Sequence, residues 1–274
     1  MERLHPMSTI VTEEHNFDTV NEKVAEAEFF LQRMAEGGSG MFGFRCYLSA
    51  FLAAARTTTL SLQRFRHLEG FDEWYEGHRE WLKDDPTARF LLDLRNAHLH
   101  GGPSPVTRSH GRGGSTLYHF SSRVTPYGLD LPDVVTVCRG HLVDLLRIVH
   151  DAYVVLGPAI DHHQYYTREH FAASGRTIDD AEIEFYGFVR TGLVEDGLTE
   201  DDRWHELRGR FVDGGIQTLF YSYLGKLTPQ PVEPDHFADF AFTPEERGWL
   251  YPPAGFKTVE AYWEHVGIEP PDHP

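Results

Sequence analysis

The strongest constraint on the fold is a helical spacing of apolar residues that recurs in one segment after another. In the second of these segments, for example, Phe44, Leu48 and Phe51 fall on one helical face. Proline and glycine separate the segments, because proline cannot continue a helix and glycine adopts the turn that ends one. The pattern predicts an all-α protein, with helices over 17–35, 40–68, 71–82, 87–100, 133–156, 178–191, 199–224 and 259–266. Glycines at 209, 214 and 215 could interrupt the segment 199–224.

The pattern changes after Gly157-Pro158, and this change suggests two regions. We expect residues 1–160 to form a helical bundle with an inserted loop at 101–131, in which a short strand pair is expected around 115–124. Residues 161–274 would form an acidic, mostly helical C-terminal extension of unknown role. The extension could mimic nucleic acid and occlude a site, or it could serve solubility and dimer packing.

The charge of the chain is uneven. It carries 42 acidic and 25 basic residues, a net charge of -17, which argues against general affinity for a phosphate backbone. Residues 37–150, however, hold 13 basic against 11 acidic residues, and 12 of those 13 are arginine. Arginine matches phosphate geometry better than lysine does. This middle segment therefore permits an RNA partner, although genome composition explains an arginine bias equally well.

Two cysteines and the hydropathy pattern bear on location. Cys46 and Cys138 both lie in helix-like apolar segments, so we expect two buried thiols and no disulfide framework. The most apolar stretch, 47–55, is too short to span a bilayer, and no signal peptide is visible at the start of the chain. We therefore expect a cytoplasmic protein without a membrane partner.

One helix has unusually clear boundaries. Asp85 is a candidate N-cap, Pro86 suits the first helical position, and Gly101-Gly102-Pro103 would end the helix. The last turns then carry Arg95-Asn96-Ala97-His98-Leu99-His100. Asn96 and His100 share one face, Arg95 and His98 share another, and a helix C-terminus favours a protonated histidine.

The pattern Arg95-Asn96-x-x-x-His100 resembles the R-x4–6-H signature of the HEPN (higher eukaryotes and prokaryotes nucleotide-binding) domains. The resemblance covers roughly residues 17–158 and not the acidic extension. It implies an antiparallel helical bundle with the motif late in the third major helix. It also implies a homodimeric, metal-independent ribonuclease of the kind used as toxins or in phage defence, with an antitoxin or regulatory protein as a further expected partner.

The implied chemistry assigns roles to these side chains. His100 would act as general base or acid, Arg95 would hold the phosphate, and Asn96 would orient His100 or a phosphate oxygen. Attack by the RNA 2′-hydroxyl would leave a 2′,3′-cyclic phosphate and a 5′-hydroxyl. A two-fold dimer would bring two histidines to one cleft. Substrate contacts are expected from His98, Arg108 and Arg112.

Other interpretations stay open. Arg95 and Asn96 could bridge neighbouring helices in a non-catalytic module that dimerises and binds a protein or a nucleotide. His98-x-His100 imitates a metal pair, but residues two apart on a helix point in nearly opposite directions, so we expect no metal and no cofactor. His162 and His163 are expected to face solvent. The aromatic residues of the extension suit a core or an interface better than base stacking; they include Phe185, Tyr186, Phe220, Tyr221 and Tyr223.

Overall fold

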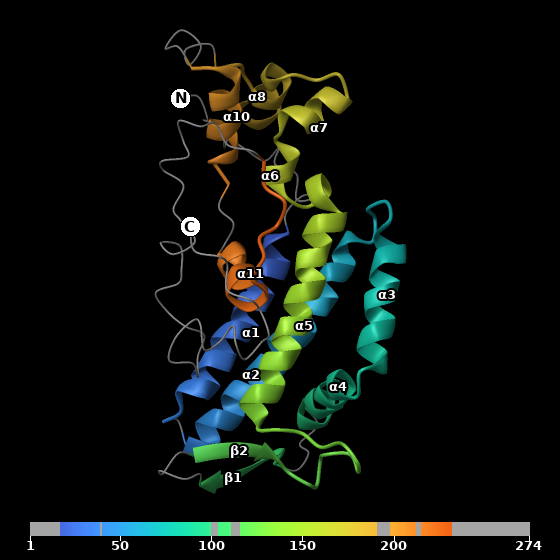
Figure 1. The fold of residues 1–274 in the computed structure, drawn as a ribbon, viewed down its shortest axis with the longest axis vertical. Coiled ribbons are helices and arrows are strands. Elements are labelled where there is room, and N and C mark those ends of the chain that lie inside the picture. Colours follow the sequence, from blue (N-terminus) through green and yellow to red (C-terminus); the bar gives the residue numbers. More distant parts are fainter. Residues whose placement is uncertain are drawn as a thin grey trace, which may run out of the picture.

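Long helices form the body of the protein (Figure 1). The computed structural model describes residues 17–38, 40–99, 104–110, 116–190, 198–211 and 215–231. The chain is mostly helical, which confirms the all-α class. The bundle contains α1 (Asp18–Glu36), α2 (Gly40–Leu62, followed by the 3-10 turn η2, Gln63–Phe65), α3 (Phe71–Asp84), α4 (Pro86–Leu99) and α5 (Val134–Val155).

Helices α1 and α2 form an antiparallel pair, and α5 lies along this pair (Figure 1). The chain turns between α1 and α2 at Gly37 and Gly38, which adopt φ values of 71° and 81° that side-chain-bearing residues rarely take. Helices α3 and α4 lie on the opposite side of α5 from α1 (Figure 1). The triplet Thr57-Thr58-Thr59 does not interrupt α2, because Thr57 and Thr58 hydroxyls bond to carbonyls one turn earlier.

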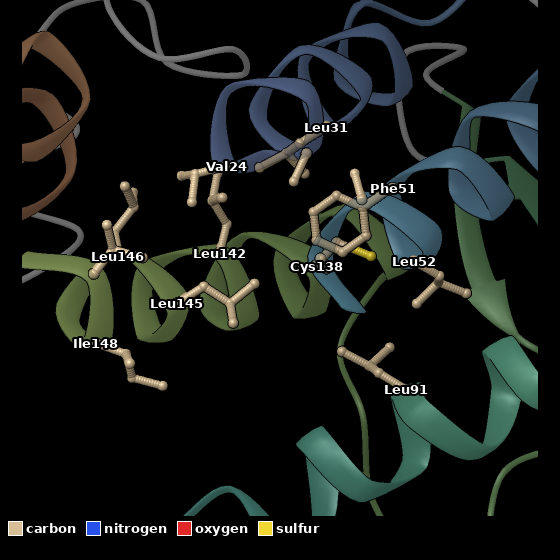
Figure 2. Close-up of a cluster of buried hydrophobic side chains, with 14 of the residues drawn as sticks. Val24, Leu31, Phe51, Leu52, Leu91, Cys138, Leu142, Leu145, Leu146 and Ile148 are labelled. Carbon is tan, nitrogen blue, oxygen red and sulfur yellow. The ribbon is translucent and has the colours of Figure 1, made fainter. Parts of the chain in front are cut away.

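The core of the bundle is built around α5, which buries side chains on more than one face (Figure 2). Val24 and Leu31 reach it from α1, and Phe51 comes from α2. Leu91 adds a contribution from α4. The α5 residues in this cluster are all nearly or fully buried: Cys138, Leu142, Leu145, Leu146 and Ile148.

The predicted loop contains a short antiparallel hairpin. Strands β1 (Val106–His110) and β2 (Thr116–Phe120) pair so that Val106 lies opposite Phe120, and both of these side chains are buried. Phe90 of α4 meets Phe120 edge-on, with ring centroids 4.9 Å apart. The strand pair was expected nearer to 115–124, so its first strand begins earlier than predicted.

A second group of helices lies at the end of the bundle away from the hairpin (Figure 1). After η3 (Gly157–Ala159) come α6 (His162–Tyr165), α7 (Arg168–Ala173), α8 (Ile178–Tyr186) and α10 (Glu200–Arg208), here called the α6–α10 region. This region has a small apolar cluster of its own: Tyr166, Phe171, Ile178, Ala181, Trp204 and Leu207.

The predicted helix 199–224 is two helices. Helix α10 ends at Gly209, and α11 (Ile216–Leu224) begins after Gly215, which has a φ of 80°. The glycines therefore break the segment, as their positions allowed. Helix α11 returns to the bundle, where it packs on α5 and α1 and Phe220 is fully buried.

Some expectations need correction or fall outside the described residues. The prediction that Cys46 is buried is wrong: Cys46 is exposed, since it lies on the opposite face of α2 from Phe44 and Leu48, whereas Cys138 is buried. Phe220 and Tyr223 belong to the core, as expected.

The helix expected over 259–266 lies outside the described residues. None of the helices in the described part is long and apolar enough to cross a membrane.

Candidate functional site: a cationic pocket around Arg95

Asp85 forms the corner between α3 and α4. Its backbone N–H donates to the carbonyl of Trp81 at the end of α3. Its carboxylate accepts hydrogen bonds from the backbone N–H groups of Thr87 (2.9 Å) and Ala88 (3.2 Å) in the first turn of α4. This confirms the predicted N-cap. The cap sets the direction in which α4 leaves α3, and with it the position of the motif in the last turns of α4.

Arg95 lies beside the buried face of α4 and is partly buried, whereas its neighbour Asn96 is exposed. The Nη1 atom of Arg95 donates to Oδ1 of Asn96 at 3.2 Å. The Nε atom of Arg95 is buried and has no hydrogen-bond partner in the described part of the protein. Asn96 therefore contacts Arg95 through a neutral oxygen. This contact provides no negative charge to balance the guanidinium.

A cavity of about 160 Å³ opens beside Arg95 at the junction of four helices. We call it the cationic pocket. Helix α2 contributes Leu52, Ala55, Arg56 and Thr59, α3 contributes Tyr75, Arg79, Leu82 and Lys83, α4 contributes Ala88, Arg89, Leu91, Leu92 and Arg95, and α5 contributes His141.

Five of the lining side chains are cations, and no aspartate or glutamate lines the pocket. Arg79 forms an ion pair with Glu76. Within the described residues the other four cations form none: Arg56, Lys83, Arg89 and Arg95. In a chain with a net charge of -17, this is a local concentration of positive charge, although Glu76 interacts electrostatically with Lys83 and Asp85 with His141. Such a pocket favours an anion.

Arg56 is also held by a neutral partner. Its Nη1 donates to Oγ1 of Thr59 at 3.1 Å, and the Thr59 hydroxyl donates to the Arg56 carbonyl at 2.9 Å. The Tyr75 hydroxyl donates to the Thr59 carbonyl at 3.0 Å, which ties α3 to α2 beside the pocket. The guanidinium groups of Arg56 and Arg95 are thus both held by uncharged oxygens. Neither of these contacts brings a negative charge to the pocket.

Sequence reasoning missed most of the lining residues, and His141 is the titratable one among them with the largest pKa shift. Burial lowers the pKa of His141 to about 4, although Asp85 opposes this shift. The imidazole is therefore neutral at pH 7 and offers a hydrogen-bonding nitrogen without adding charge. A signal was present in the sequence: His141 lies three residues after Cys138 and four before Leu145, both of which were expected to face inward.

The remaining predicted site residues are distributed differently. Arg108 is exposed on β1, opposite Tyr118, and does not line the cationic pocket. His98 belongs to α4, but its side chain is outside the described part, as are all of His100 and Arg112. The structure therefore brings Arg95 and Asn96 together, and the position of His100 relative to them stays a prediction.

His162 and His163 contact other side chains of the protein. His162 stacks on Phe211 with ring centroids 4.4 Å apart, and Nδ1 of His163 lies 3.4 Å from a carboxylate oxygen of Asp161. Both are partly buried rather than facing solvent. Among the described residues, no three His, Cys, Asp or Glu side chains are grouped so that they could hold a metal ion.

Comparison with known proteins adds no identity to this geometry. The chain matches no family model, no curated protein and no solved structure. The cationic pocket and the motif that borders it are therefore the features of the chain that bear on its function.

Proposed function

We propose that this protein is a metal-independent endoribonuclease that acts as a homodimer. The observation that supports the proposal best is the position of Arg95 in the lining of the cationic pocket, with a buried Nε that lacks a partner among the described residues. A guanidinium that is positioned but not neutralised is suited to a phosphate, which accepts its N–H groups in a fork.

The proposed reaction is an intramolecular transfer in RNA. The 2′-oxygen forms a bond to phosphorus while the bond from phosphorus to the 5′-oxygen breaks. The proton of the 2′-hydroxyl passes to a base, and the departing 5′-oxygen takes a proton from an acid. His100 would serve as the base or the acid, Arg95 would stabilise charge on the phosphoryl oxygens, and Asn96 would hold Arg95 in place.

One motif offers a single histidine for two proton transfers. A homodimer would place two copies of His100 at one cleft, so that one accepts a proton and the other donates one. In this proposal the protein belongs with the ribonucleases that act as toxins or in phage defence, and an antitoxin or regulatory protein would control it.

A cleavage assay on RNA tests the proposal. Purified wild-type protein with EDTA present should yield fragments that end in a 2′,3′-cyclic phosphate and a 5′-hydroxyl. Arg95→Ala and His100→Ala should each lower the rate about 100-fold or more. Arg64→Ala is the matched control, since Arg64 is exposed and its side chain bonds to Thr19 outside the pocket.

Two results would reject this mechanism. One is a cleavage rate that survives both the Arg95 and the His100 substitutions. The other is a rate abolished by EDTA, which would point to a metal. Arg95→Lys sharpens the assay: lysine keeps the charge but loses the fork, so an intermediate rate is expected.

A non-catalytic module that binds a nucleotide is the second candidate. The residues that line the pocket favour this candidate, because three of the four cations without an ion pair lie outside the motif: Arg56, Lys83 and Arg89. This candidate predicts nucleotide binding by a dimer without any cleavage of RNA, so the same assay separates the two functions.

A further inference from the structure

We propose that the cationic pocket binds a terminal phosphate, the phosphomonoester at the end of an RNA strand or on a free nucleotide. This inference goes beyond the proposed function: Arg95 would contact the scissile phosphodiester during cleavage, whereas the pocket as a whole would hold a terminal phosphate. It does not require cleavage, because a terminal phosphate would fill the pocket equally well in a binding module.

The number of free cations favours a monoester over an internal phosphodiester. A diester carries a single negative charge, whereas a phosphomonoester carries about -1.5 to -2 at pH 7 and has three oxygens that accept hydrogen bonds. Arg56, Lys83, Arg89 and Arg95 have no ion pair within the described residues. Four positively charged side chains from three helices line the pocket, which suits a dianion with three open oxygens better than a monoanion.

The size of the pocket favours the end of a ligand. Its volume of about 160 Å³ is close to that of a cavity of about 150 Å³ that accepts benzene. Pockets that enclose a whole drug-sized ligand are larger, about 300 Å³ or more. A phosphate with part of its sugar fits inside such a space, and the rest of a longer ligand would lie outside it.

The floor of the pocket is apolar. Leu52, Ala55 and Leu91 are almost completely buried there, and Leu82 and Leu92 add partly exposed apolar surface. A bare inorganic anion would leave this surface without a partner. An organic phosphate would cover it with the carbon atoms of its sugar or base, which gives it an advantage over inorganic phosphate.

The geometry also provides donors that are already in place. Arg56 is fixed by Thr59, and Arg95 by Asn96, so little side-chain entropy is lost when either one binds. The Nε of Arg95 has no hydrogen-bond partner in the described part of the chain, so it is a donor available to an acceptor on a ligand.

Calorimetric titration of the full chain tests the inference. The probes are uridine, uridine 5′-monophosphate, and a short 2′-O-methyl RNA carrying a phosphate or a hydroxyl at its 5′ or 3′ end. The methyl group blocks attack by the 2′-oxygen, so binding is measured without cleavage. We expect the phosphate-bearing form of a probe to bind about tenfold tighter than its phosphate-free form.

The variant for this test avoids the motif. The double substitution Arg56→Gln with Lys83→Gln removes two of the four free charges from side chains that are not in the buried core. It should abolish the preference for a terminal phosphate. Arg64→Gln should preserve it, because Arg64 lies in η2 and outside the pocket.

The outcomes separate this inference from the proposed function. A preference shown by the oligonucleotides identifies a strand end as the ligand, and one shown by uridine 5′-monophosphate alone identifies a free nucleotide; both support the inference. Equal binding of phosphorylated and unphosphorylated probes overturns it, as does a preference that survives in the double variant. Phosphate preference without RNA cleavage would overturn only the ribonuclease, and cleavage without phosphate preference would overturn only this inference.

Discussion

The bundle and the α6–α10 region place different kinds of side chain at their centres. In the bundle, Phe51, Leu142 and Val149 are almost inaccessible and touch other apolar groups. In the α6–α10 region, the carboxylate of Glu182 has no exposed surface and accepts hydrogen bonds from Arg190 and Arg203. The comparison shows that the α6–α10 region combines a small apolar cluster with a buried ion network, whereas the bundle is organised by a larger apolar core.

The network around Glu182 is complete on its acceptor side. Its Oε1 accepts from Nε of Arg190 and Nε of Arg203, each at 3.0 Å, and its Oε2 accepts from the Arg190 backbone at 2.7 Å and Nη2 of Arg203 at 2.6 Å. Arg203 also donates to Asp179. Charges that are paired and hydrogen-bonded in this way tolerate burial, whereas loss of one member leaves an uncompensated charge.

The largest effect is expected from a cavity in the bundle. Phe51→Ala removes a ring with no exposed surface and should lower the free energy of unfolding by about 3–5 kcal/mol. Chemical denaturation measures the change. Phe42→Ala, on the same helix but 80% exposed, should change the stability by no more than about 0.5 kcal/mol. Similar losses for both variants would contradict the core described for α2.

A somewhat smaller and more local effect is expected from Glu182→Gln. The substitution keeps the shape of the side chain but leaves two arginines without their carboxylate, a cost of about 3 kcal/mol. Hydrogen exchange should become faster in α8 and α10 and stay unchanged in α1 and α5. Arg168→Gln breaks the half-exposed pair with Glu200 and should alter exchange little. Unchanged exchange in α8 after Glu182→Gln would disprove the role of the network.

The two regions should also respond to acid at different pH values. Burial lowers the pKa of His141 from 6.5 to about 4, so between these values the unfolded chain binds a proton that the folded bundle does not. His141 should therefore contribute a loss of about 1–2 kcal/mol to the stability of the bundle as the pH falls from 6.5 to 4.5. His141→Asn should flatten this part of the stability profile; a variant with the wild-type slope would contradict the assignment.

The α6–α10 region should keep its stability to a lower pH than the bundle does. Burial opposes ionisation of Glu182, but the hydrogen bonds from Arg203 and the Arg190 backbone outweigh it, so its pKa lies below the ordinary 4.5. A lowered carboxyl pKa contributes stability above 4.5 that is lost as the pH falls through the folded value. Hydrogen exchange at pH 5.5 should thus detect weakening in α5 and none in α8.

The smallest effect is expected from helix caps. Asp133 accepts hydrogen bonds from the backbone of Val135 and Thr136 at the start of α5, and Asp133→Ala should cost about 1 kcal/mol of the global stability. Thr199→Ala removes the equivalent cap of α10. If the regions unfold separately, Thr199→Ala will increase exchange in α10 alone. An effect that spreads to α5 would mean that the two regions unfold together.

Much of the helical architecture was predictable because its signals are local. Asp85-Pro86 fixes the α3–α4 corner through hydrogen bonds that span only three residues. Gly209 lies where α10 ends, and Gly215 precedes α11 in a left-handed conformation that favours glycine. The exposure of Cys46 was mispredicted, although the phase of the apolar positions around it was sufficient to place it on the outer face.

The candidate site was only partly predictable. Arg95 and Asn96 were identified from the motif, but the motif contains no information about the other cations of the pocket. Arg56, Lys83 and Arg89 lie on three different helices, and each taken alone has the spacing of an ordinary surface residue. His141 was overlooked because a histidine within an apolar helical face does not reveal which cavity it borders.

The sequence by itself determined where the long helices of the bundle lie and that one capped helix carries Arg95 near its end, but it did not predict α6 and α7. These properties depend on interactions between residues a few positions apart. Only the tertiary structure decided that α11 returns to the bundle, that Glu182 is enclosed by Arg190 and Arg203, and that cations from three helices surround one cavity. Those outcomes depend on how rigid helices rotate and pack against one another, which is set by the whole core and not by any single segment.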